Sequence, residues 1–234
     1  MLTNSVLTTV LIYAAFVAGA YLWGSLNFAV IISKLKGSDI RKLGSGNPGT
    51  MNIRRHFGFK IAFLTMFLDA LKGFLPCIIG WWLLGRDGGN LAFGTRFGFG
   101  YDRIGIYIGG LAAIVGHIFP VFYKFKGGKG IASSIGIGIA INPWLTLAFF
   151  VFGFIFMTVT HMGSVTSFIV ITPALIYELF RLHGSGQVAA QILIFILFFL
   201  AVWAHRNNIA KLFAGRESKT RVFKGKGEKF VGEK

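Results

Sequence analysis

The sequence predicts an all-α integral membrane protein with about seven transmembrane helices. Of its 234 residues, 54% are hydrophobic and only 14% are charged, whereas soluble domains average about 25% charged residues. The apolar residues also gather in runs close to the roughly 20 residues that cross a bilayer. Such a chain lacks the polar surface that a water-soluble globular protein needs.

Seven apolar segments are expected to form these helices. They cover residues 7–33, 60–84, 105–123, 131–141, 144–160, 165–181 and 188–204. The fourth is short and rich in glycine, and Asn142-Pro143 separates it from the fifth, so a tight hairpin or a re-entrant segment also fits it. The 32 glycines of the chain suit close helix packing, because lipid provides no hydrophobic drive between helices.

The distribution of Lys and Arg predicts the orientation of the spans. With seven spans and the N-terminus outside, the inside segments carry 19 basic residues and the outside segments carry 4. Basic residues concentrate in cytoplasmic loops, so we expect the C-terminus in the cytoplasm. Residues 1–217 would form one membrane domain with an extracytoplasmic loop at 85–104 of structural role, followed by a basic cytoplasmic tail at 218–234.

The net charge of +16 would suggest a nucleic-acid partner in a soluble protein. Here the charges lie between apolar runs, where orientation and attraction to phosphate explain them, so we expect membrane lipid as a partner and no nucleic acid. Cys77 is the single cysteine, which excludes an intrachain disulfide. The sequence has no H-E-x-x-H, no Cys/His metal spacing and no G-x-S-x-G, so neither a metal nor a cofactor is expected.

The first polar segment of the inside face, residues 41–55, reads RKLGSGNPGTMNIRR. Glycines let backbone N–H groups turn toward an anion, Ser and Asn add neutral donors, and Arg offers a planar fork that suits phosphate oxygens. A flexible loop that only sets orientation would explain the same composition. Ser45 and Arg55 are the catalytic candidates here, and the candidates for substrate binding are Arg41, Lys42, Gly44, Gly46, Asn47, Gly49 and Asn52.

The second polar segment, residues 124–134, reads KFKGGKGIASS and stands directly before an apolar helical run. Backbone donors at a helix N-terminus together with a lysine suit a phosphate group. The P-loop spacing G-x-x-x-x-G-K-[ST] is absent, so the motif alone does not decide the matter. The candidates for substrate binding are Lys126, Gly127, Gly128, Lys129 and Gly130.

The third polar segment, residues 205–217, follows the last span and reads HRNNIAKLFAGRE. His205 and Asn208 are three residues apart, so a continuing helix would place them on one face. A histidine at this position is a candidate general base, and Asn208 would orient or assist it. The alternative is a snorkelling interfacial histidine followed by an amphipathic basic helix.

A few ionisable residues lie within the apolar segments, where each needs a partner or a function. Asp69 and Lys72 are three residues apart, which favours a structural ion pair that reaches toward the cytoplasmic site. His117 is expected to be a satisfied histidine at a helix end. Glu178 is expected to be exposed at the outer interface.

Together, these segments resemble the bacterial acyl-phosphate:glycerol-3-phosphate acyltransferases over most of the chain. GSLNF at 24–28 resembles an early motif that usually has proline where this chain has Asn27, and 41–55 resembles IRK-x-GSGN-x-GATN-x-x-R with Thr50-Met51 in place of Ala-Thr. Asp69, Lys72 and Gly73 match D-x-x-KG, and residues 117–130 match H-x-F-P-V-F-x-x-FKGGKG. Further matches are Ser164 and Ser167 in S-x-x-S, and His205, Arg206, Asn208, Ile209 and Glu217 in H-R-x-N-I and its trailing glutamate.

The resemblance implies seven spans in a bacterial inner membrane, a cytoplasmic active site and transfer of an acyl group from acyl phosphate to the 1-hydroxyl of glycerol 3-phosphate. The products would be lysophosphatidate and inorganic phosphate, in the first step of phospholipid synthesis. Ser164 and Ser167 would bind substrate, Glu217 would be structural, and we expect a monomer. The hydroxyl proton would pass to His205 or, alternatively, to a phosphate oxygen of the substrate.

A transporter or flippase for an organic phosphate or an anionic lipid is the rival hypothesis. It would explain the spans, the basic loops and the glycine-rich breaks. Transporters, however, place polar sites near the midplane between inverted repeats, whereas the unusual residues of this chain cluster at one membrane surface. A structural scaffold would leave the GGKG and HRNNI segments unexplained.

Overall fold

The computed structural model describes residues 2–84 and 103–216, and all of their regular structure is helical. Loop residues 85–102, Glu217 and the tail 218–234 lie outside the described residues. In chain order the elements are α1 (Leu2–Ser25), α2 (Phe28–Leu35), the 3₁₀ turn η1 (Ile40–Lys42), α3 (Thr50–Leu84), α5 (Ile104–Ile118), the 3₁₀ turn η2 (Val121–Tyr123), α6 (Ile131–Ile141), α7 (Pro143–Thr160), α8 (Gly163–Leu182), α9 (Val188–Ala204) and α10 (Arg206–Phe213).

Five stretches are long and apolar enough to cross a membrane, and the bent pair of α9 and α10 makes a sixth. The five are the α1 stretch Val6–Ser25, α3, the α5–η2 stretch Ile104–Tyr123, α7 and α8. The fourth predicted segment is α6, whose eleven residues rise about 16 Å, well short of the ~30 Å hydrocarbon core. Membership of the all-α membrane class is therefore confirmed, with α6 as a short helix enclosed by the others.

The backbone breaks at two places, at Asn27 within the first predicted segment and at Gly58 just before the second. The first segment was expected to be continuous over 7–33, but it divides into α1 and α2, because the Asn27 side chain accepts a hydrogen bond from Val30 N (3.0 Å) and starts a new helix. Within α3, Gly58 adopts φ 83° and ψ 176°, a conformation that glycine tolerates best. The kink separates the polar first turns, 50–57, from the apolar stretch 59–84.

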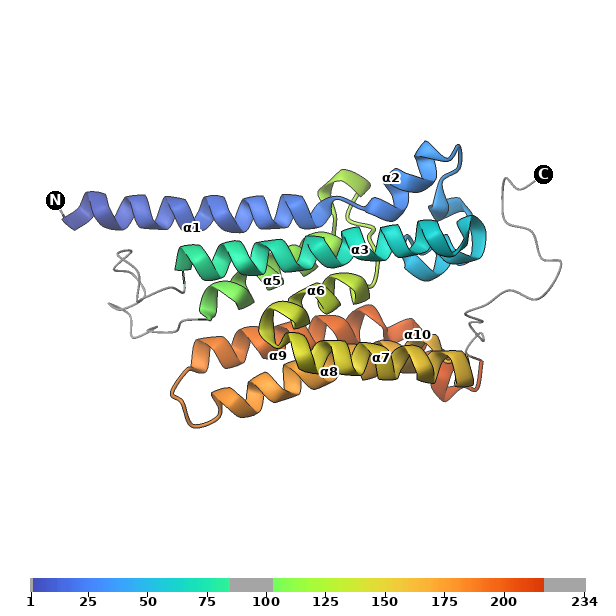
Figure 1. The fold of residues 1–234 in the computed structure, drawn as a ribbon. Helices are drawn as coiled ribbons and strands as arrows, with labels where there is room; N and C mark the ends of the chain where they lie inside the picture. The colour runs from blue at the N-terminus through green and yellow to red at the C-terminus, as the bar shows by residue number, and fades with distance from the viewer. Residues whose placement is uncertain (1, 85–102, 217–234) are drawn as a thin grey trace.

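The helices form two layers with α6 between them, as Figure 1 shows. One layer contains α1, α3 and α5, the other contains α7, α8 and α9, and α6 contacts α3 on one side and α8 on the other. Glycine permits this packing: a Cβ on Gly105 would lie 1.9 Å from Gly80 O, and one on Gly73 would lie 2.0 Å from Ser133 O. Such distances allow no side chain, which accounts for the glycine content of the spans.

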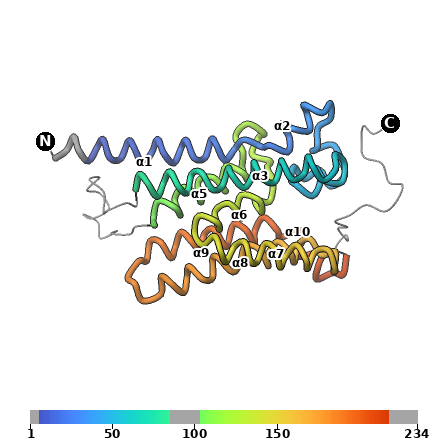
Figure 2. The backbone as a smooth tube through the Cα atoms, viewed as in Figure 1, coloured from blue at the N-terminus to red at the C-terminus, as the bar shows by residue number. Residues whose placement is uncertain are grey.

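The polar segments gather at one end of this bundle, here called the loop end. It contains η1, the start of α3, the glycine segment before α6, the start of α8 and α10, and the tube in Figure 2 shows α2 and α10 at this same end. The opposite end contains the start of α1, the start of α5 and the turn between α8 and α9. The three polar segments of the sequence are thus brought to the same end of the molecule.

Candidate active site

The first loop is shaped by Asn52, which is 2% exposed. Its amide donates to Ile40 O (3.2 Å) and to Leu43 O (2.9 Å), and its Oδ1 accepts from Ser45 N (3.4 Å). Gly44 has a positive φ of 52°, and a Cβ there would lie 2.6 Å from Asn52 Oδ1. Asn52 therefore holds the loop closed, and its own polar atoms are used in doing so.

The rest of this loop turns tightly around polar side chains that reach the surface. Gly46 also has a positive φ, 68°, Asn47 N donates to Ser45 Oγ (3.4 Å) and Gly49 N donates to Asn47 O (3.0 Å). Ser45 is exposed. Its hydroxyl thus lies on the rim of the loop, where a substrate could reach it. Lys42 and Arg55 of the same segment are exposed as well.

Arg41 is engaged within the protein. Its Nη2 lies 2.6 Å from Asp39 Oδ2 and its Nε donates to both oxygens of the same carboxylate, while its guanidinium lies 5.6 Å from the centre of the Tyr123 ring. This pairing holds the pKa of Asp39 down at about 2. Asp39 was not among the predicted site residues, although an acidic residue two positions before a candidate arginine is a visible signal in the sequence. Only the remaining donors of Arg41 can reach a substrate.

The second polar segment is pressed against the end of α5. Gly127 N donates to Ile118 O (3.1 Å) and Gly128 N donates to His117 O (3.2 Å). A Cβ on Gly127 would lie 2.0 Å from His117 O, and one on Gly128 would lie 2.4 Å from His117 Nε2. The two glycines are therefore needed for close approach, and their N–H groups are already bonded to carbonyls.

The segment then turns directly into a helix. Gly130 has a positive φ of 80° and is followed at once by the first residue of α6. The glycine segment therefore stands directly before an apolar helix, as the sequence predicted. Lys126 is exposed. A Cβ on Gly128 would lie 3.3 Å from Pro48 O, which shows that the first and second polar segments lie against each other.

A chain of hydrogen bonds joins the second segment to the third. Lys129 Nζ donates to Asn208 Oδ1 at 2.7 Å, and Asn208 Nδ2 donates to Ser164 Oγ at 2.6 Å. These residues are far apart in the sequence, and Ser164, at the start of α8, is 3% exposed. The second serine of the predicted pair, Ser167, donates within its own helix to Gly163 O (2.9 Å). Ser164 is therefore the serine that takes part in the chain.

His205 lies at the junction of α9 and α10, where the chain bends by 57°. The helix does not continue straight past His205, although Asn208 N still bonds to His205 O (2.8 Å). His205 is 1% exposed, its Nδ1 lies 2.9 Å from Ala201 O, and its ring packs edge-on against Phe168. A carbonyl can only accept, so Nδ1 carries the proton and Nε2 keeps its lone pair. Burial lowers the pKa of His205 below its usual 6.5, which favours this neutral state.

Beneath the glycine segment lies a buried polar layer. Lys72 Nζ is 3.0 Å from Asp69 Oδ1 and donates to Leu26 O at 2.6 Å, in the break between α1 and α2. His117 Nδ1 lies 3.4 Å from Ser133 Oγ. The pair at Asp69 and Lys72 therefore ties α3 to the break before α2, which is a structural contact.

A family model described as glycerol-3-phosphate acyltransferase matches residues 14–215. This range includes the first two polar segments and all but the last two residues of the third. The chain belongs to the glycerol-3-phosphate acyltransferase family. The resemblance in the sequence motifs is thereby confirmed, and the transporter hypothesis is set aside.

Curated relatives carry the same family name. The glycerol-3-phosphate acyltransferase of Paraburkholderia phytofirmans is 40% identical over 201 residues, covering 86% of this chain and 87% of the relative. That of Aquifex aeolicus is 37% identical over 199 residues, covering 85% and 94%. Similarity at this level over nearly the whole of both chains indicates a common catalytic domain.

Two solved structures share the fold. Both are crystal structures of PlsY, an integral membrane glycerol 3-phosphate acyltransferase, one in a glycerol 3-phosphate form and one in a lysophosphatidic acid form. The TM-scores are 0.69 and 0.65 at 35% and 34% identity, and each match covers 88% of this chain and 94% of that chain. The present chain is accordingly a multi-pass membrane acyltransferase.

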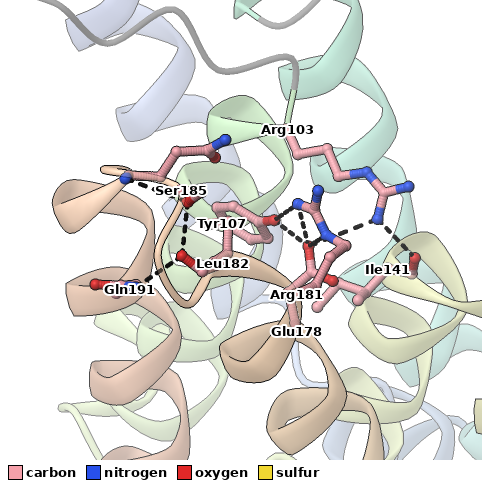
Figure 3. A network of polar contacts seen from close by, with 9 residues as sticks. Arg103, Tyr107, Ile141, Glu178, Arg181, Leu182, Ser185 and Gln191 are labelled. Carbon is pink, nitrogen blue, oxygen red and sulfur yellow. Dashed lines mark hydrogen bonds and ion pairs between the residues drawn. The ribbon is translucent and has the colours of Figure 1, made fainter.

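A second polar network lies at the opposite end of the bundle (Figure 3). Glu178 is fully buried, which contradicts the expected exposure at the interface. Its Oε1 accepts from the Tyr107 hydroxyl and from Arg181 Nη2 (2.8 Å), and Arg103 Nη1 lies 3.5 Å away. Arg103 also donates to Ile141 O (3.4 Å). The carboxylate thus connects α5, α6 and α8, and sequence periodicity gave no signal for it.

Across residues 2–84 and 103–216, His, Cys, Asp and Glu side chains form no group of three or more that could hold a metal ion. Arg54, next to the candidate Arg55, has its Nε buried and without a hydrogen-bond partner in the described part of the chain. Arg54 is therefore a further donor at the loop end, and it was not among the predicted site residues.

Proposed function

We propose that this chain transfers a fatty acyl group from acyl phosphate to the 1-hydroxyl of glycerol 3-phosphate, which yields lysophosphatidate and inorganic phosphate as the first step of phospholipid synthesis. The observation that carries the proposal is the chain Lys129–Asn208–Ser164, which joins the second polar segment to the third and to the start of α8 at one end of the bundle. The names of the relatives and the glycerol 3-phosphate form of the structural neighbour support the acceptor.

Lys129 is proposed to bind the phosphate of glycerol 3-phosphate. Asn208 and Ser164 orient its ammonium group, and the N-terminal turn of α6, which follows Gly130, adds a favourable dipole for an anion. Gly127 and Gly128 contribute by letting this segment approach α5, since their N–H groups are bonded to carbonyls. The phosphate contacts therefore come from the lysine and the helix start.

The first loop is proposed to bind acyl phosphate. Ser45, Asn47 and Arg55 supply neutral and charged donors at its rim, and two phosphorylated substrates that repel each other need such concentrated positive charge. Lys42 and the buried donor of Arg54 add to it. Asn52, Gly44, Gly46 and Gly49 shape the loop, and Arg41 is largely engaged with Asp39. The acyl chain would lie among the spans, where each buried methylene contributes about 0.8 kcal/mol.

His205 is proposed to remove the proton of the attacking hydroxyl. Its Nδ1–H is held by Ala201 O, so Nε2 can accept that proton as the oxygen attacks the acyl carbon and phosphate departs. A positioned base of this kind typically gives about 10²–10⁴-fold in rate. The departing phosphate needs little protonation because acyl phosphate is a mixed anhydride with a good leaving group.

The topology belongs to the same proposal. Seven membrane passages, with the N-terminus outside and the loop end in the cytoplasm, would place the basic segments where basic residues concentrate. Counting α6 as a short seventh helix and α9 with α10 as one unit agrees with this arrangement. We propose a monomer in a bacterial inner membrane, with the active site on the cytoplasmic face and no metal or cofactor.

Phosphate release by the purified protein tests the proposal. The protein in lipid receives palmitoyl phosphate with and without glycerol 3-phosphate, and palmitoyl-CoA in parallel. We expect release only with palmitoyl phosphate and glycerol 3-phosphate together, with lysophosphatidate appearing in step. Turnover with palmitoyl-CoA alone as the donor would contradict the assigned donor, and no turnover from a folded sample would contradict the reaction.

A further inference from the structure

The last helix, α10, presents an unusual outward face at the loop end. Its eight residues include none that is buried, and it leaves the direction of α9 at 57°. At 100° per residue, the exposed positions 206, 207, 210, 211 and 213 share one side. The partly covered positions, 208, 209 and 212, share the other side, which faces the protein.

The composition of this outward face matches a membrane surface. Phe213 is 87% exposed and Lys211 is exposed as well, while the Arg206 guanidinium lies 3.9 Å from the centre of the Trp203 ring. Basic residues on an amphipathic helix next to a membrane span are typical of segments that bind anionic lipid headgroups. From Arg206 to its last residue the sequence carries nine Lys and Arg against three Glu, a net positive charge that favours anionic headgroups.

The inward face of the same helix takes part in the candidate active site. Asn208 bonds to Lys129 and to Ser164, and it lies between Arg206 and Lys211 in the same two turns. A movement of α10 relative to the bundle would therefore change the distance of 2.7 Å between Asn208 Oδ1 and Lys129 Nζ. An interaction that fixes the outward face of α10 would also fix the position of Asn208.

We infer that the outward face of α10 is a docking surface for anionic phospholipid headgroups of the adjoining leaflet, and that this docking holds Asn208 against Lys129. Each Lys or Arg near an anionic surface contributes about a fivefold preference for it. Turnover is then higher in an anionic bilayer than in a neutral one, although an anionic bilayer repels the anionic substrates.

Fluorescence quenching tests the docking without any need for activity. Ala210→Cys places a label on the outward face, while the native Cys77 is buried, and the unsubstituted protein serves as the blank. In lipid nanodiscs with a quencher at headgroup depth, we expect several-fold stronger quenching with phosphatidylglycerol than with phosphatidylcholine. Lys211→Glu should abolish this difference, whereas Lys36→Glu, a charge reversal at the exposed residue that follows α2, should leave it intact. Equal quenching in both lipids would overturn the inference.

Turnover supplies the second test, and this part rests on the proposed function. With both substrates saturating, we expect kcat to be about fivefold higher in phosphatidylglycerol discs, to lose that gain in Lys211→Glu and to recover it in Lys211→Arg. A kcat that does not depend on lipid charge in a protein that turns over would overturn the link to Asn208. Absence of turnover in every disc would count against the proposed reaction, and the quenching would still decide the docking.

Discussion

Asn208 offers the sharpest test of how the site is assembled. Its side chain joins an ammonium and a hydroxyl from two other segments, so Asn208→Leu removes both bonds while keeping a side chain of similar size. A hydrogen bond to a charged group contributes about 1.5–3 kcal/mol, and a neutral one about 1 kcal/mol. If orientation of Lys129 is needed in the transition state, kcat/KM should fall by roughly 10- to 150-fold from the charged bond alone.

A double-mutant cycle with Lys129→Met separates orientation from general damage. Phosphate release from palmitoyl phosphate gives kcat/KM for the wild type, both single variants and the double variant. In the Lys129→Met background we expect Asn208→Leu to cost no more than about fivefold, the value of the remaining bond to Ser164. Asn207→Leu, on the exposed side of the same turn, is the control and should leave kcat/KM unchanged.

Two results would refute this reasoning. Equal losses from Asn208→Leu in both backgrounds would show that the asparagine does not act through Lys129. An Asn208→Leu variant within about threefold of wild type would show that the observed bond has no role in the transition state. Thermal unfolding of each variant in detergent excludes loss of the fold as the cause.

Burial lowers the pKa of His205 below 6.5, so the residue stays neutral at pH 7 and kcat/KM should fall only as the pH drops below 6.5. A His205→Gln variant that keeps near-full kcat and the same fall of activity at low pH would assign the proton to a substrate phosphate. Glu178→Ala leaves two arginines at the opposite end without their carboxylate, and it should lower the free energy of unfolding by about 3–5 kcal/mol with kcat/KM within about threefold; unchanged denaturant unfolding would contradict this. A Cβ on Gly136 would lie 1.9 Å from Ala70 O, so Gly136→Ala should destabilise the protein by about 1–3 kcal/mol, whereas Gly19→Ala, with open space around it, should not; equal effects of the two would refute the packing argument.

Most of the helices could be predicted from the sequence, because an apolar run and its break are local properties of the chain. The limits of α6 and α9 agree with the predicted segments 131–141 and 188–204. The failures are also local in origin. The first run was apolar throughout, and nothing in its hydropathy showed that the Asn27 side chain would cap a new helix. The sequence showed that α6 is short, but it could not show which helices would enclose it.

The candidate site divides in the same way. The spacing of glycine, lysine and arginine predicts which residue types would meet phosphate, and these assignments stay predictions. How each residue is used did not follow. The side-chain amide of Asn52 donates to backbone carbonyls of its own loop. The N–H of Gly128 donates to His117 O and is not available to a substrate.

The sequence by itself determined that the chain is a membrane protein of this family, with its basic segments between apolar helices. Only the tertiary structure decided that Asn208 joins Lys129 to Ser164, that Glu178 is buried against Tyr107, and that α10 turns away from α9. The physical reason is distance along the chain. A hydrogen bond depends on tenths of an ångström between groups that lie 44 to 79 residues apart, and neither periodicity nor composition carries that information.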